Sequence, residues 1–203
     1  MIRRRLPLRL ARGVRRWLRD TRGVTATEFA LIAPPFFALI LGSLDIGQWV
    51  YAKVLINGAA AQAARANALE TADTTAADAM VQSIVSPILP NVSISSTRRN
   101  YYDFADVDRP ERWNDTNTDG NCNNSESYVD ENGNGHWDAD VARPGNGNAS
   151  DVVVYQVTAT YQSMFRNPFL PGSWGDRRVT ATTVKKNQPF ALQAAYTSAT
   201  GTC

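Results

Sequence analysis

A single apolar run near the N-terminus is the feature that most constrains how this chain can fold. From Phe29 to Leu44 the sequence carries no charged residue and only one polar residue, Ser43. That run alone is slightly short for a membrane-spanning helix, which needs about 20 residues. Flanking residues supply the missing length, with Glu28 and Asp45 near the two edges. The sequence therefore predicts a transmembrane helix over residues 24–52; a cleaved secretory peptide is the weaker interpretation, because no convincing A-x-A site follows the run.

Charge is distributed very unevenly along the chain. Residues 1–22 hold nine arginines and one acidic residue, so they carry +8 and the remaining residues carry −6 of the total of +2. Arginines beside a membrane helix keep that side in the cytoplasm. We therefore expect a basic cytoplasmic leader, residues 1–23, and an extracytoplasmic domain, residues 53–203. Nucleic acid is not an expected partner, because the arginines are too scattered for a base-reading helix.

The residues after the apolar run predict an α+β domain. Alanine-rich residues 50–70 continue the membrane helix, and residues 74–89 form a second, amphipathic helix. Alternating and β-branched patterns predict strands at 92–96, 151–161 and 178–185. This order favours a small antiparallel sheet packed on the extended helix. A long Asn-, Asp- and Gly-rich loop over residues 103–150 separates the first two strands.

Two details of the long helix can be predicted. Pro34 and Pro35 lie within the apolar run, and proline removes a backbone donor and clashes with the preceding turn. We therefore expect a kink or a local loosening of the helix there. In its alanine-rich part, the residues expected to share one packing face are Val54, Leu55, Gly58, Ala61, Ala64 and Ala68.

The long loop contains a calcium-loop pattern. Residues 115–126 match D-x-[DN]-x-[DN]-G-x5-E at every fixed position, and a second match begins at Asp130. The twelfth position of the second match is Val141, so we expect Asp140 to replace the missing acid. The expected calcium ligands, with Asn121 and His136 acting through backbone carbonyls, are Asp115, Asn117, Asp119, Asn121, Glu126, Asp130, Asn132, Asn134, His136, Asp138 and Asp140. The alternative is a solvated polar loop that binds no ion.

The cysteine and histidine content of the chain limits the bonds it can form and the reactions it can catalyse. If the C-terminal part is extracytoplasmic, Cys122 and Cys203 can form a disulfide; the alternative is two thiols that are free or separately paired. His136 is the only histidine, and the sequence has no G-x-S-x-G elbow, P-loop or dinucleotide fingerprint. We therefore expect no enzymatic activity. An anchored hydrolase that uses only carboxylates is the alternative left open.

The start of the apolar run resembles a type IV prepilin processing site. Gly23 is followed by four residues, then Glu28 and the aromatic Phe29. The resemblance implies that a prepilin peptidase cuts after Gly23, so that the mature chain begins at Val24. It also implies that the Glu28 carboxylate pairs with the N-terminal ammonium of a neighbouring subunit, since a buried charge is tolerated when paired. A simple signal anchor with Glu28 at the membrane interface is the alternative.

A longer pattern resembles the N-terminal signature of the TadE/TadG-like family, the minor pseudopilins of bacterial tight-adherence (Tad/Flp) pili. The pattern is RG-x-x-x-x-EFAL-x-AP, an apolar run, an acid-x-G and an A-x-x-AAR-x-A. It is carried by Arg22, Gly23, Glu28, Phe29, Ala30, Leu31, Ala33, Pro34, Asp45, Gly47, Ala60, Ala63, Ala64, Arg65 and Ala66. Pro35 and Phe29 depart from the family's usual aliphatic residue and the major pilins' tyrosine, which favours a minor pseudopilin.

The resemblance implies a function in Tad/Flp pilus assembly. The chain would be a single-pass protein of the bacterial inner membrane with a periplasmic C-terminal domain, and whether it enters the pilus stays open. Its implied partners are the prepilin peptidase, other pilins and pseudopilins, and the Tad secretion machinery. A calcium-binding envelope or surface protein unrelated to pili is the alternative.

Overall fold

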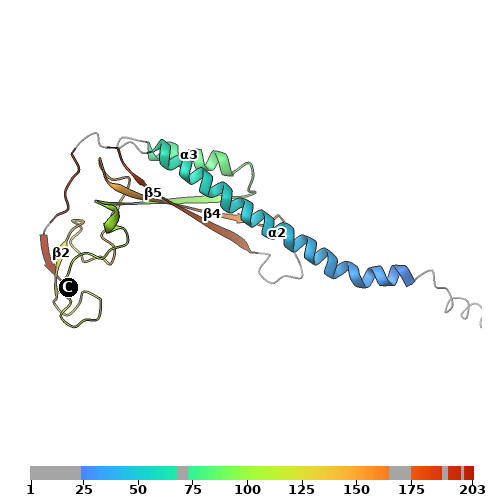
Figure 1. The fold of residues 1–203 in the computed structure, drawn as a ribbon, viewed down its shortest axis with the longest axis horizontal. Helices are drawn as coiled ribbons and strands as arrows, with labels where there is room; N and C mark the ends of the chain where they lie inside the picture. The colour runs from blue at the N-terminus through green and yellow to red at the C-terminus, as the bar shows by residue number, and fades with distance from the viewer. Residues whose placement is uncertain (1–23, 68–72, 165–174, 189–191, 198) are drawn as a thin grey trace, which may run out of the picture.

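The computed structural model describes residues 24–67, 73–164, 175–188, 192–197 and 199–203. One long helix lies across a four-stranded antiparallel sheet and projects well beyond it (Figure 1). A two-stranded sheet with its loops lies at the other end of the molecule, away from the projecting helix. The expected α+β class, with a long N-terminal helix and a small antiparallel sheet, is confirmed.

Helix α2 covers Val24–Ala66, 43 residues. It is long and apolar enough to cross a membrane: its most apolar stretch of 18 residues has a mean hydropathy of 1.9, and only 6% of that stretch is buried against the rest of the chain. Pro34 and Pro35 both lie inside the continuous helix, so they do not end it. Each proline costs one hydrogen bond, but the apolar residues around the pair keep their helical conformation, as is common in membrane helices.

The main sheet has the order β3-β1-β4-β5. Its long strands are β1 (Ser93–Tyr101), β4 (Val152–Gln162) and β5 (Asp176–Lys186), and the short β3 (Arg143–Pro144) pairs with β1. All neighbours are antiparallel. The central β4 has partners on both sides from Val152 to Thr160, so most of its residues form the middle of the sheet.

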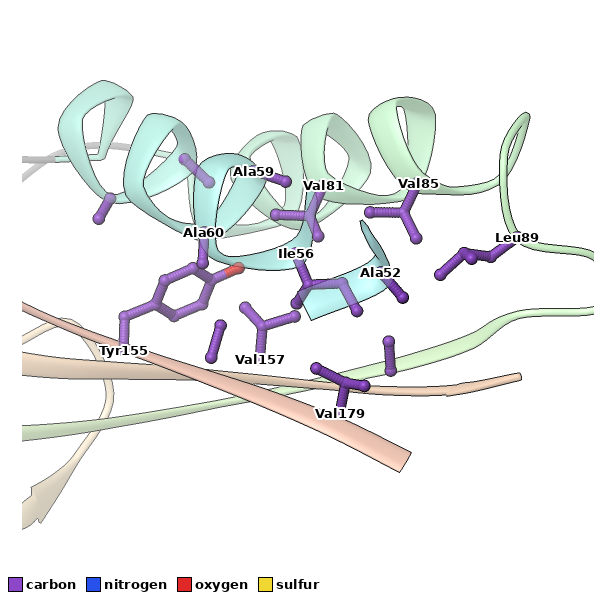
Figure 2. Packing of buried hydrophobic residues seen from close by; sticks show 14 of the residues in the cluster. Ala52, Ile56, Ala59, Ala60, Val81, Val85, Leu89, Tyr155, Val157 and Val179 are labelled. Carbon is purple, nitrogen blue, oxygen red and sulfur yellow. The ribbon is translucent and has the colours of Figure 1, made fainter. Parts of the chain in front are cut away.

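Helices α2 and α3 (Thr74–Val85) cover one face of this sheet and form the main core. Ile56 of α2, Val81 of α3 and Val157 of β4 are fully buried and point toward one another (Figure 2). The predicted packing face of α2 is only partly right: Ala64 is buried and Leu55 packs against the core, but Val54 and Gly58 are exposed. Ala68 lies outside the described residues. The α2 residues buried on this face are Ala52, Ile56, Ala59, Ala60, Ala63 and Ala64. Their small side chains let the helix lie close to the sheet.

A polar cluster ties α3 to the sheet. The Asp78 carboxylate accepts hydrogen bonds from Arg98 Nη2 at 2.6 Å, Tyr155 Oη at 2.7 Å and Ser96 Oγ at 2.8 Å. Burial raises the pKa of Asp78, but the hydrogen bonds from Arg98, Tyr155 and Ser96 outweigh it, so this pKa lies below its usual range. The ionised carboxylate therefore holds α3, β1 and β4 together.

The segment between β1 and β4 contains more structure than the predicted loop. It forms the 3-10 turn η2 (Phe104–Asp106), strand β2 (Ser127–Asp130) and strand β3. Strand β2 pairs with β6 (Ala199–Thr202) at the C-terminus. A disulfide joins Cys122 to Cys203, with their Cα atoms 5.7 Å apart. The disulfide thus fixes Cys203 to the segment between β1 and β4.

Candidate functional site

The processing residues lie at the beginning of α2. Gly23 is outside the described residues, and Val24 is the first residue of the helix. Glu28 is exposed one turn further along. The carboxylate is therefore accessible to a group from outside this chain.

Asp45 marks the point where α2 meets the domain. The residue is only 8% exposed. Ser163 Oγ donates a hydrogen bond to its Oδ1 at 2.5 Å, and the Arg177 guanidinium pairs with its Oδ2. One turn later, Gln48 Oε1 accepts the backbone N–H of Met164 at 3.0 Å. These contacts fasten the helix to the end of β4 and the start of β5.

The Asp45 contacts also mark where the projecting part of α2 ends. After Asp45, α2 packs against the sheet, and Ala52, the last residue of the predicted span, is fully buried in the core. The part that projects is residues 24–44, which at 1.5 Å per residue is about 31 Å long. This length matches the hydrocarbon core of a bilayer, about 30 Å.

Residues 115–126, which we call loop 1, fold around the predicted ligand residues. The Asp115 carboxylate accepts the backbone N–H groups of Asp119 at 3.2 Å and Gly120 at 3.0 Å. Asn117 Oδ1 accepts the N–H of Asp119 at 3.0 Å, and Asp119 Oδ1 accepts that of Asn121 at 2.8 Å. Gly120 has a φ of +78°, a conformation that favours glycine.

Glu126 closes loop 1 from its twelfth position. Its Oε1 accepts the backbone N–H groups of Thr116 at 2.7 Å and Asn117 at 3.3 Å, and its Oε2 accepts that of Asn123 at 3.3 Å. These groups belong to positions two, three and nine of the loop. Burial raises the pKa of Glu126, but hydrogen bonds from Thr116, Asn123 and Asn117 outweigh it, so this pKa lies below its usual range.

Loop 2, which starts at Asp130, repeats these contacts position by position. The Asp130 carboxylate accepts the N–H groups of Asn134 at 3.1 Å and Gly135 at 2.8 Å. Asn132 Oδ1 accepts the N–H of Asn134 at 3.1 Å, and Asn134 Oδ1 accepts that of His136 at 2.8 Å. The side chains at positions one, three and five therefore accept hydrogen bonds from the same backbone positions in both loops.

Glu111 takes the place of the missing acid in loop 2. This fully buried residue accepts the N–H groups of Glu131 at 2.7 Å and Asn132 at 3.0 Å through Oε1, and that of Asp138 at 3.2 Å through Oε2. These are positions two, three and nine, the positions that Glu126 serves in loop 1. The sequence pattern missed Glu111 because it precedes the loop instead of ending it.

Asp140, the residue expected to complete loop 2, has other partners. Its carboxylate pairs with Arg99 and accepts a hydrogen bond from Tyr101 Oη at 3.1 Å. His136 contributes only its backbone N–H to the contacts described above. Within the described ranges, no group of three or more His, Cys, Asp or Glu side chains is placed to hold a metal ion. A cation here would depend on Asn and backbone oxygens as well as on carboxylates.

Comparison with known proteins identifies one segment. Residues 23–65 match the family model described as TadE-like protein, which confirms the resemblance for this part of the chain. The match covers the expected processing position, the projecting part of α2 and most of its buried face. No curated protein and no solved structure matches the chain. The interpretation of the two loops therefore depends on their own geometry.

Proposed function

We propose that this chain, with its TadE-like segment, is a membrane-anchored minor pseudopilin that takes part in Tad/Flp pilus assembly. The observation that carries the proposal is that the TadE-like match falls on a helix whose first half is apolar, exposed and of membrane-spanning length. A prepilin peptidase removes the leader after Gly23. The chain is then a single-pass protein of the bacterial inner membrane, with its domain in the periplasm. Its role is structural and not catalytic.

The geometry explains how such an anchor works. Residues 24–44 cross the bilayer, and the contacts of Asp45 with Ser163 and Arg177 hold the domain directly at the membrane surface. Cleavage after Gly23 leaves an ammonium group at the start of α2. The exposed Glu28 carboxylate of a neighbouring pilin or pseudopilin pairs with that group, because each charge offsets the cost of placing the other in an apolar environment.

Substitution of Glu28 tests this pairing. In a strain that produces only the variant, Glu28→Ala leaves leader cleavage largely intact but reduces the number of pili seen by electron microscopy. Thr25→Ala, a change of a neighbouring exposed residue on the same helix, serves as the matched control and leaves pili at wild-type numbers. Normal pili on the Glu28→Ala strain would show that the carboxylate is not needed for assembly.

The two loops favour a second function, calcium binding in the periplasmic part. The specific observation is that Glu126 and Glu111 accept the N–H groups of the same three positions in their respective loops. In calcium loops of this pattern, oxygens from positions one, three and five, a backbone carbonyl at position seven and a bidentate glutamate surround the ion. Loop 2 would obtain its glutamate from Glu111.

Calcium binding is tested on the full chain in detergent, because the core includes α2. We expect a higher melting temperature in millimolar calcium than in chelator, since a ligand that binds only the folded state stabilises it. Magnesium should have little effect, because it demands a tighter octahedral site. Calorimetry should show two sites, of which Glu126→Gln removes one and Glu111→Gln the other, whereas Asp140→Asn retains both. Equal melting temperatures with calcium and chelator, and no heat of binding, would refute the site.

A further inference from the structure

An apolar hollow lies beside Asp45, at the point where α2 leaves the domain. Its volume is about 370 Å³. It is bounded by α2, by the connection between α3 and β1, and by the end of β4. The residues that line it are Ser43, Leu44, Gly47, Gln48, Tyr51, Ile88, Leu89 and Met164.

The lining of the hollow is accessible from outside the domain. Leu44, Tyr51 and Met164 are 44%, 53% and 57% exposed. Gly47 keeps the space open, because a Cβ atom added there would meet no described atom within 4 Å. Apolar side chains gathered around an open hollow are costly to leave in water and typically mark a binding surface.

The position of the hollow indicates what covers it. Ser43 and Leu44 are the last residues of the projecting apolar helix, so the hollow continues from the surface that faces the bilayer in the proposed function. One polar group that lines the hollow also lacks a hydrogen-bond partner: Gln48 Nε2 is buried and donates to no atom of the described residues. The carboxylate of Asp45 is neutralised by Arg177, so it does not repel an anionic group. A hydrogen-bond acceptor attached to an apolar chain would give this N–H a partner once the Gln48 side chain turns toward the hollow.

We propose that this hollow binds one acyl chain of a membrane glycerophospholipid, with Gln48 Nε2 donating to an ester oxygen of that lipid. Ester oxygens lie between the hydrocarbon and the headgroups, at the level where Asp45 ends the span. The lipid then fills the gap between the helix and the domain and holds the domain at a fixed angle to the bilayer. This inference depends on the membrane anchoring in the proposed function.

The test uses the full-length chain, reconstituted in nanodiscs of phosphatidylethanolamine and phosphatidylglycerol and released into detergent for native mass spectrometry. Gly47→Phe fills the hollow. Gly58→Phe is the matched control, because Gly58 is also a helical glycine with open space around its Cβ position but does not line the hollow. We expect wild type and Gly58→Phe to retain one phospholipid and Gly47→Phe to lose it. Gln48→Leu keeps the apolar contact but removes the donor, so about tenfold weaker lipid retention is expected.

A control for membrane anchoring and a second variant of the hollow separate the possible failures. Carbonate extraction of membranes reports on the anchor alone: if wild type is extracted as a soluble protein, the proposed function fails first. If wild type stays in the membrane but retains no lipid, retains only detergent, or loses no lipid in Gly47→Phe, the lipid site is overturned. A second copy of the chain in place of lipid would overturn it too. Should Gly47→Phe not fold, Ile88→Glu places a charge at the rim without changing α2, and it should also lose the lipid.

Discussion

The two ends of the domain are stabilised by different interactions. The half that contains α2, α3 and the main sheet has a core made mostly of alanine and valine side chains, with isoleucine, leucine and tyrosine among them (Figure 2). The other half, which we call the acidic half, consists of the segment between β1 and β4 together with β6. It has short strands, carboxylates that accept backbone N–H groups, a disulfide, and Glu131 ion-paired with Arg109 and Arg112. The first half depends mainly on burial of apolar surface, to which the ion pairs of Asp78 and Asp45 are added. The second depends mainly on its ionised carboxylates and on the redox state of its cysteines.

The largest effect is expected from a charge placed in the apolar core. Ile56→Asp buries an unpaired carboxylate, at a cost comparable with the total stability of a domain, about 5–15 kcal/mol. We expect no cooperative unfolding transition in thermal circular dichroism. Val54→Asp is the matched control on the same helix: Val54 is 66% exposed, so the variant should melt close to wild type. Similar behaviour of the two variants would contradict the packing of α2.

Removal of the disulfide should affect the acidic half selectively. The double variant Cys122→Ser, Cys203→Ser releases a loop that spans 81 residues of sequence, and such a change costs about 2–5 kcal/mol. Amide hydrogen exchange should become faster in β2 and β6, while β4 stays protected. Equal acceleration in β4 would mean that the two halves unfold as one unit.

Acid should weaken the acidic half through Glu131. Burial raises the pKa of Glu131, but hydrogen bonds from Arg109 and Arg112 outweigh it and lower the pKa to about 2. A carboxylate with a depressed pKa stabilises the fold above its unfolded value, about 4.5, and that contribution is lost as pH falls toward 2. The loss is at most about 3 kcal/mol. Urea unfolding between pH 5 and pH 2 should show a smaller pH dependence for Glu131→Gln than for wild type.

The smallest effect concerns Lys185 in the sheet half. Burial, with the nearby charge of Arg98, lowers the pKa of Lys185 to about 8. The unfolded chain therefore binds more protons above this pH, so stability should rise as pH increases from 8 to 9, by at most about 1.4 kcal/mol. Urea unfolding at the two pH values measures this rise, and Lys185→Gln should lack it. A fall in wild-type stability over this interval would contradict the environment of Lys185.

The apolar half could be predicted from the sequence because its elements have regular patterns. The valines of β4 and the alanines of α2 indicated a strand and a long helix, since burial of one face is a local, periodic property. The helix face was assigned only partly correctly because most residues in this part of α2 are small or apolar, so periodicity alone could not select Ile56 over Val54. Strand β1 also continues past its predicted end, because Arg98 and Arg99 find acidic partners there.

The acidic half could be predicted only where its contacts are local. The spacing in loop 1 includes Glu126, and the same local spacing identified most of loop 2. Glu111 was missed because its contact with loop 2 joins residues distant in sequence, and nothing in its neighbourhood marks it. Asp140 was assigned to loop 2 by proximity in sequence, but Arg99 and Tyr101 attract its carboxylate elsewhere. Strand β6 pairs with β2 across a much longer separation.

The mass of the mature chain shows whether this protein is processed as a minor pseudopilin. The protein should be extracted from membranes of cells that express the prepilin peptidase and measured intact by mass spectrometry. We expect a chain that begins at Val24, without residues 1–23. We also expect Gly23→Leu to leave the full-length chain uncleaved, because a bulky side chain blocks the cleavage position. A wild-type chain that still begins at Met1 in those cells would contradict the assignment of a processed minor pseudopilin.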